Sequence, residues 1–175
     1  MEITASEKLW CKNLTITYES EKEVTFEHCP VESMPMEEFC YVVLDTKKWN
    51  EIWRKDVFRY LPEDITELLE NEFLNLPVHA LQKAHSKIRR VLQYLEEDNE
   101  IWSPVIETDI ESVLSLADGR HRYWVIRNLN IPFFTAAIAV KHLPRLIECD
   151  VIYKNTELSQ TFDPFTRPEW DDRKY

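Results

Sequence analysis

The chain has 175 residues, of which 44% are hydrophobic and 12% aromatic, so the composition excludes a disordered protein. This length suits one domain with an appendage and allows a substantial buried core. The net charge of −11, from 32 acids against 21 bases, disfavours non-specific binding to nucleic acid, which depends on cations that neutralise phosphates.

Targeting and cysteine patterns add two expectations. The N-terminus has no basic segment followed by an apolar core, and no apolar run approaches the ~20 residues of a membrane span. We therefore expect a cytoplasmic protein with no membrane association. The four cysteines show no C-x-x-C spacing, which predicts reduced thiols. His28, Cys29 and Cys40 lack a fourth ligand at a recognisable spacing, so no metal site is predicted.

The first part of the chain predicts strands. Residues 14–29 alternate apolar and polar side chains around a polar stretch, which indicates a β-hairpin. Residues 39–44 predict a short apolar strand. Because no flexible linker follows, we expect residues 1–56 to be an N-terminal extension of hairpin and helix that packs on the core and adds strands to its main sheet.

The helix of this extension is predicted over residues 46–54. Asp45 can cap it, and Trp49, Ile52 and Trp53 recur on one of its faces. This spacing favours tryptophans that pack in the core over tryptophans that form a ligand cage.

Residues 57–153 are the predicted core, and strands and helices alternate through residues 57–140. Strands are expected at 57–61, 104–108, 113–117 and 133–140, and helices from 62–64 onward, from Pro77 to Glu97, and from Tyr123 to near Asn128. The continuous apolarity of residues 133–140 predicts a strand that is buried on both faces. The alternation predicts an α+β (α/β-like) fold, a small mixed β-sheet with packed helices.

Two further segments have a basic or aromatic character. The long helix that ends at Glu97 carries His79, Lys83, Lys87, Arg89 and Arg90, which form either a solvated face or a strip that extends a phosphate site. Residues 154–175 are a polar C-terminal tail with four aromatic residues. Such a tail packs on its own domain or binds a protein partner.

The turn after the strand at 113–117 holds the main candidate site. Gly119 is the only glycine of the chain, which predicts a positive φ angle or a close approach of the backbone. Asp118 is expected to cap the helix that follows, whose first N–H groups attract anions. Arg120, His121 and Arg122 add donors suited to phosphate oxygens, so the turn predicts a phosphate cradle. The alternative is a surface turn in which the arginines pair with nearby acids.

This turn resembles the central motif of the ParB/sulfiredoxin superfamily, whose members read roughly (V/A)-D-G-(H/R)-H-R. The resemblance covers roughly residues 58–140, and its strongest part includes A-D-G-R-H-R-Y at 117–123, N-L-N-I-P at 128–132 and S-P-V-I at 103–106. It implies a ParB/sulfiredoxin-like fold in which Asp118, Gly119, Arg120, His121 and Arg122 bind a nucleotide (ATP, ADP or CTP), together with Mg²⁺.

The chain departs from two groups of this superfamily. Arg120 stands where sulfiredoxins have a reactive cysteine, so sulfinic acid reduction is not expected. ParB proteins continue into a helix-turn-helix domain, whereas 35 residues follow Val140 here, so partition-site binding is not expected. The free-serine kinases and the stand-alone ParB-like proteins fit the turn best.

Three classes of function stay open. The first is a kinase or NTPase, in which His121 moves a proton or contacts phosphate while Glu107 and Asp109 contact Mg²⁺ or the acceptor. The second is a non-catalytic, nucleotide-responsive regulatory or interaction module. The third is a ParB-like nuclease or DNA-binding protein, against which the net charge weighs.

Overall fold

A computed structural model describes residues 2–8, 11–18, 22–28, 39–56, 61, 78–97, 100–108 and 113–153. The predicted helix from 62–64 onward, the tail at 154–175 and Asp109 lie outside the described residues. The same holds for the predicted strand at 57–61 except for Leu61, which is buried.

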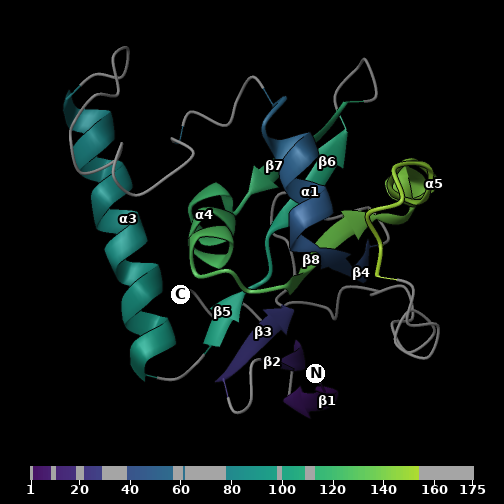
Figure 1. Cartoon of the computed structure of the whole chain (residues 1–175), viewed down its shortest axis with the longest axis horizontal. Coiled ribbons are helices and arrows are strands. Elements are labelled where there is room, and N and C mark those ends of the chain that lie inside the picture. Colours follow the sequence, from purple (N-terminus) through teal and green to yellow (C-terminus); the bar gives the residue numbers. More distant parts are fainter. Residues whose placement is uncertain are drawn as a thin grey trace, which may run out of the picture.

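The described strands form two four-stranded sheets (Figure 1). The first has the order β1-β2-β3-β5, from strands Glu2–Lys8, Cys11–Tyr18, Lys22–His28 and Glu100–Trp102. The second has the order β4-β8-β6-β7, from strands Phe39–Asp45, Phe133–Ala139, Val105–Thr108 and Leu114–Asp118.

Both sheets are mixed. β2 and β3 pair in an antiparallel manner, which confirms the predicted hairpin, and β5 joins β3 in a parallel manner. In the second sheet β8 pairs antiparallel with β4 and parallel with β6. β4 therefore joins the second sheet, whereas β1 to β3 pair with β5 in a sheet of their own. The arrangement confirms the predicted α+β class with small mixed sheets and packed helices.

The described helices are α1 (Thr46–Trp53), α3 (Val78–Glu97), α4 (Arg120–Asn128) and α5 (Leu143–Glu148), with a 3-10 turn, η1 (Val140–His142), before α5. None of these helices is long and apolar enough to span a membrane.

The core lies where α1 and α4 pack on β8. Asp45 caps α1 as predicted, because its carboxylate accepts a hydrogen bond of 3.0 Å from the Lys48 amide. Trp49 and Trp53 are each only 1% exposed, which confirms that they pack in the core. The ring centroids of Trp53 and Tyr123 lie 5.7 Å apart, and those of Tyr123 and Phe134 of β8 lie 5.2 Å apart. These contacts fix the position of α4 on the sheet.

The prediction of a strand buried on both faces is confirmed for β8. Phe134, Ala136 and Ile138 join the main core, while Ala137 and Ala139 pack with Tyr41 and Val105 in a second, smaller cluster. Because side chains alternate along a strand, this division assigns them to opposite faces of the sheet.

On the other side of α4 lies α3, which stands beside both α4 and β5 (Figure 1). Its Ile88 and Val91 are buried, whereas Lys87, Arg89 and Arg90 are exposed. The amphipathic pattern predicted for this helix therefore orients its apolar stripe toward the core. The space between α3, β5 and the start of α4 holds the candidate site.

Candidate functional site

The single glycine lies at the start of α4. Gly119 has a φ of +84° and is itself the N-cap residue, so the prediction that Asp118 caps the helix is wrong. A Cβ at Gly119 would lie 2.8 Å from Pro104 Cα and 2.9 Å from Pro104 Cβ. The predicted positive φ and close backbone approach are both observed, and the group approached is Pro104, which leads into β6.

Asp118, the last residue of β7, forms an ion pair with Arg122 one turn along α4. Partial removal of water raises the pKa of the carboxyl group. The Arg122 charge and a hydrogen bond from the Gly119 amide outweigh this effect, so the pKa of Asp118 lies below its usual range. The carboxylate is therefore ionised at neutral pH.

Arg122 also binds the backbone of the segment that joins β5 to β6. Its Nη1 donates hydrogen bonds to the carbonyl oxygens of Trp102 and Ser103, at 3.1 and 3.3 Å. The side chain is only 16% exposed. The guanidinium thus holds the turn, β5 and α4 in a fixed arrangement.

Arg120 points back toward the strand before it. Its Nη1 lies 3.4 Å from the carbonyl oxygen of Ala117, and the side chain is half-buried. Arg120 is not among the residues that line the neighbouring pocket, whereas Asp118, Gly119, His121 and Arg122 are. The structure therefore brings four of the five predicted cradle residues to one cavity.

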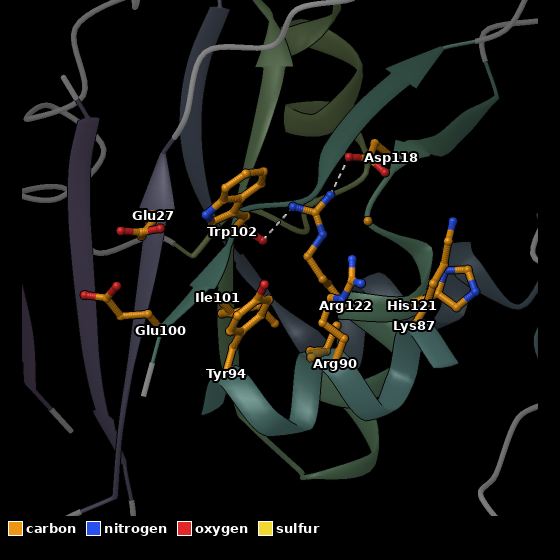
Figure 2. Close-up of a pocket in the computed structure, with 12 residues that line it drawn as sticks. Glu27, Lys87, Arg90, Tyr94, Glu100, Ile101, Trp102, Asp118, His121 and Arg122 are labelled. Atoms are coloured by element: carbon orange, nitrogen blue, oxygen red, sulfur yellow. Dashed lines mark hydrogen bonds and ion pairs between the residues drawn. The ribbon is translucent and has the colours of Figure 1, made fainter. Parts of the chain in front are cut away.

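That cavity has a volume of about 500 Å³ and lies between α3, the ends of β3 and β5, and the first turn of α4 (Figure 2). This volume falls in the range of about 300–1,000 Å³ that is typical of small-molecule sites. The helix start contributes to its wall, where the first N–H groups of α4 have no partner within the helix.

One end of the pocket is basic. Figure 2 shows Lys87 of α3 and His121 of α4 on the same side of the cavity, and Arg90, which also lines it, between Lys87 and Tyr94. Burial of the His121 ring, with the positive charge of Lys87, lowers its pKa to about 4. The ring is therefore neutral at pH 7, and one nitrogen donates while the other accepts a hydrogen bond.

The opposite end of the pocket is aromatic and acidic. Trp102 and Tyr94 line it with 53% and 51% of their area exposed, and Figure 2 shows Glu27 and Glu100 on the side away from Lys87 and His121. The sequence interpretation missed these four residues. The order Glu100, Ile101, Trp102 is the sequence signal that could have indicated β5, because side chains alternate between the two faces of a strand. In the structure Ile101 is buried and its two neighbours are not.

The two predicted catalytic acids are placed differently. Glu107 is a half-buried residue of β6 opposite Ser115 and is not among the residues that line the pocket. Asp109 lies outside the described residues. Their role, like the proton transfer predicted for His121, stays a prediction. Among the described residues no group of three His, Cys, Asp or Glu side chains is arranged to hold a metal ion.

Comparisons with known proteins give one informative result. No protein-family model and no curated protein matches the sequence. The chain is similar to a solved structure, the crystal structure of the Oncogenic Suppression Activity protein, a plasmid fertility inhibition factor, as its gold(I) cyanide derivative. The TM-score is 0.54 at 10% identity, over 91% of this chain and 82% of that chain. The likeness supports the fold class, which is consistent with a ParB/sulfiredoxin-like fold.

Proposed function

We propose that this chain binds a nucleotide, ATP, ADP or CTP, with its phosphates at the basic end of the pocket. The observation that carries the proposal is that Lys87, Arg90 and the first turn of α4 line one cavity of about 500 Å³. Ammonium and guanidinium groups bind phosphate oxygens, and a helix N-terminus adds backbone donors and a favourable dipole.

His121 and Arg122 have separate parts in this arrangement. The neutral His121 ring donates a hydrogen bond to a phosphate oxygen, and the negative charge of the bound phosphate raises the pKa of the ring from about 4. Arg122 holds the wall of the pocket through its bonds to Trp102 and Ser103. It acts on the ligand chiefly by positioning the residues around it.

Mg²⁺ fits the same end of the pocket. Mg²⁺ is commonly held by one or two carboxylates together with substrate phosphates and water. Asp118 is ionised, 73% exposed and lines the pocket beside the basic residues, so it supplies the carboxylate.

The pocket favours binding over a specific reaction. Phosphoryl transfer also needs a group that orients the acceptor, and neither Glu107 nor any other carboxylate besides Asp118 stands at the basic end among the described residues that line the pocket. A nucleotide-responsive interaction module is therefore the stronger form of the proposal. Release of inorganic phosphate in the presence of Mg²⁺ would instead establish an NTPase.

Calorimetric titration with ATP and with inorganic tripolyphosphate, each with and without Mg²⁺, tests this proposal. Replacing both Lys87 and Arg90 with Ala should weaken binding of both ligands by about 10–100-fold, because two charge-assisted contacts are lost. Arg89→Ala is the matched control, since Arg89 is an exposed residue of the same helix that does not line the pocket. Equal losses in the two variants, or no binding by the wild type, would contradict the proposal.

A further inference from the structure

The aromatic and acidic end of the pocket has no part in phosphate binding, and its composition calls for a different ligand group. Carboxylates repel phosphates, so Glu27 and Glu100 direct any anionic group toward the opposite end. Figure 2 shows these acids separated from Lys87 and His121 by the width of the pocket, with Tyr94 and Trp102 on their side of it. The cavity therefore orients a ligand that has an anionic end and a neutral end.

We propose that this end of the pocket binds a nucleobase that carries an exocyclic amino group, with Trp102 as the stacking surface and Glu27 and Glu100 as the hydrogen-bond acceptors. The inference rests on the proposed phosphate site and names the class of base that its ligand carries. Cytosine, adenine and guanine belong to this class, whereas uracil and hypoxanthine do not.

The register of the first sheet places the acids beside the indole. Glu27 of β3 is the parallel partner of Trp102 of β5, so their Cα atoms lie across one strand spacing of about 4.8 Å. Glu100 precedes Trp102 by two residues and lies on the same face of the strand, about 6.5 Å along it. Glu27 and Glu100 thus flank Trp102 in two directions, one on the neighbouring strand and one along its own strand.

Burial separates the two faces of these strands. Phe26 and its partner Ile101 are 0% and 4% exposed and belong to the core, and Ile101 also lines the pocket. Trp102 is 53% exposed although it is a large apolar residue at a cavity wall. Exposed aromatic rings in such a wall are suited to base stacking, which is tolerant of the base because every base has a π face.

Carboxylate chemistry supplies the selectivity. An ionised carboxylate only accepts hydrogen bonds, so it favours the amino groups of cytosine N4, adenine N6 or guanine N2. Uracil presents carbonyl oxygens on either side of its one N–H group, and hypoxanthine has a carbonyl oxygen in place of the adenine amino group. In either base a carbonyl oxygen would face the carboxylates in place of the amino group and be repelled.

Titration of the wild type with two pairs of nucleotides tests the inference. CTP should bind at least about 10-fold more tightly than UTP, and ATP at least about 10-fold more tightly than ITP. UTP and ITP lack the hydrogen bond from an amino group to a charged acceptor, and their carbonyl oxygens are repelled. In Glu27→Gln combined with Glu100→Gln the preference should fall below about 3-fold, because glutamine both donates and accepts.

A second set of variants addresses stacking. Trp102→Ala should weaken every nucleotide by about 10-fold, whereas Trp102→Phe should retain most of the affinity and neither should change the affinity for tripolyphosphate. Tight tripolyphosphate binding with equal affinities for CTP and UTP and for ATP and ITP would overturn the base inference and leave the phosphate site standing. Absence of binding by tripolyphosphate and by all nucleotides would overturn both.

Discussion

The Arg122 guanidinium donates a hydrogen bond of 3.1 Å to the carbonyl oxygen of Trp102, 20 residues earlier in the chain. This contact joins the first turn of α4, which lines the basic end of the pocket, to the last residue of β5, which lines the aromatic end. The two ends of the candidate site are therefore held at a fixed separation by one side chain.

The first prediction concerns this side chain. Arg122→Ala should lower the free energy of unfolding by about 1.5–3 kcal/mol, because hydrogen bonds from a charged donor to two backbone carbonyls are lost. The ion pair with Asp118 adds little, since that carboxylate is 73% exposed. Urea denaturation measures the change. Arg90→Ala, an exposed pocket residue, should stay within about 0.5 kcal/mol, and an equal loss in both variants would contradict a positioning role for Arg122.

The second prediction concerns Gly119. Gly119→Ala should destabilise the fold by about 2–4 kcal/mol, because alanine is strained at a φ of +84° and its Cβ would meet Pro104 Cα at 2.8 Å. Thermal and urea unfolding report the effect. Asn130→Gly is the reverse control at another positive φ, of +55°, and should be neutral or slightly stabilising. A Gly119→Ala variant as stable as the wild type would show that the turn adapts freely.

The third prediction is a pH dependence. The pKa of His121 is lowered from 6.5 to about 4 in the folded chain, so between these values the unfolded chain binds more protons. Stability should therefore fall as the pH drops from about 6.5 to about 4. Above 6.5 the His121 ring is neutral in both the folded and the unfolded chain, so its titration should no longer change the stability. His121→Gln should reduce this fall by about 1–2 kcal/mol, after allowance for solvent screening.

The measurement is the difference in unfolding free energy between wild type and His121→Gln, followed from pH 7.5 to pH 4 in buffers of equal ionic strength. Taking the difference removes the effect of the other titrating groups. A difference that does not change with pH would show that His121 titrates at its ordinary value in the folded chain.

The fourth prediction concerns a buried hydroxyl pair next to the turn. Ser103 Oγ and Thr135 Oγ1 lie 2.6 Å apart, and both residues are buried. Thr135→Val should cost about 1–3 kcal/mol because it removes the partner of the Ser103 hydroxyl. The double variant, Thr135→Val with Ser103→Ala, should lose less unfolding free energy than the sum of the losses in the two single variants. A double-mutant cycle measures the coupling, and strict additivity would mean that the hydroxyls contribute independently.

Local sequence patterns were sufficient to predict several parts of this fold. The cap at Asp45 and the spacing of Trp49 and Trp53 predicted α1, and continuous apolarity predicted the doubly buried β8. The uniqueness of Gly119 indicated its positive φ. These features depend on residues that are close in sequence, so periodicity and capping report them directly.

The elements that were missed have weak local signals. α5 has six residues, of which Leu146 alone is buried, so it presents no apolar stripe. β1 and β5 depend on partners elsewhere in the first sheet.

The same reason explains why only half of the pocket was predicted. The turn at 118–122 is one continuous segment with a recognisable composition, whereas Glu27 reaches Trp102 through parallel pairing of strands that are far apart in sequence. Asp118 illustrates the other limit. Both it and Gly119 suit an N-cap position, but Gly119 occupies it and the Asp118 carboxylate pairs with Arg122 instead.

The most direct test of the central claim is a nitrogen–proton NMR titration of the uniformly labelled wild type with ATP and Mg²⁺. The account predicts that the amide signals of Arg120, His121 and Arg122 shift most, together with the indole signal of Trp102, while the amide of Arg145 in the short helix α5 stays in place. Shifts confined to other parts of the chain, or none at saturating ATP, would contradict a phosphate site at the start of α4.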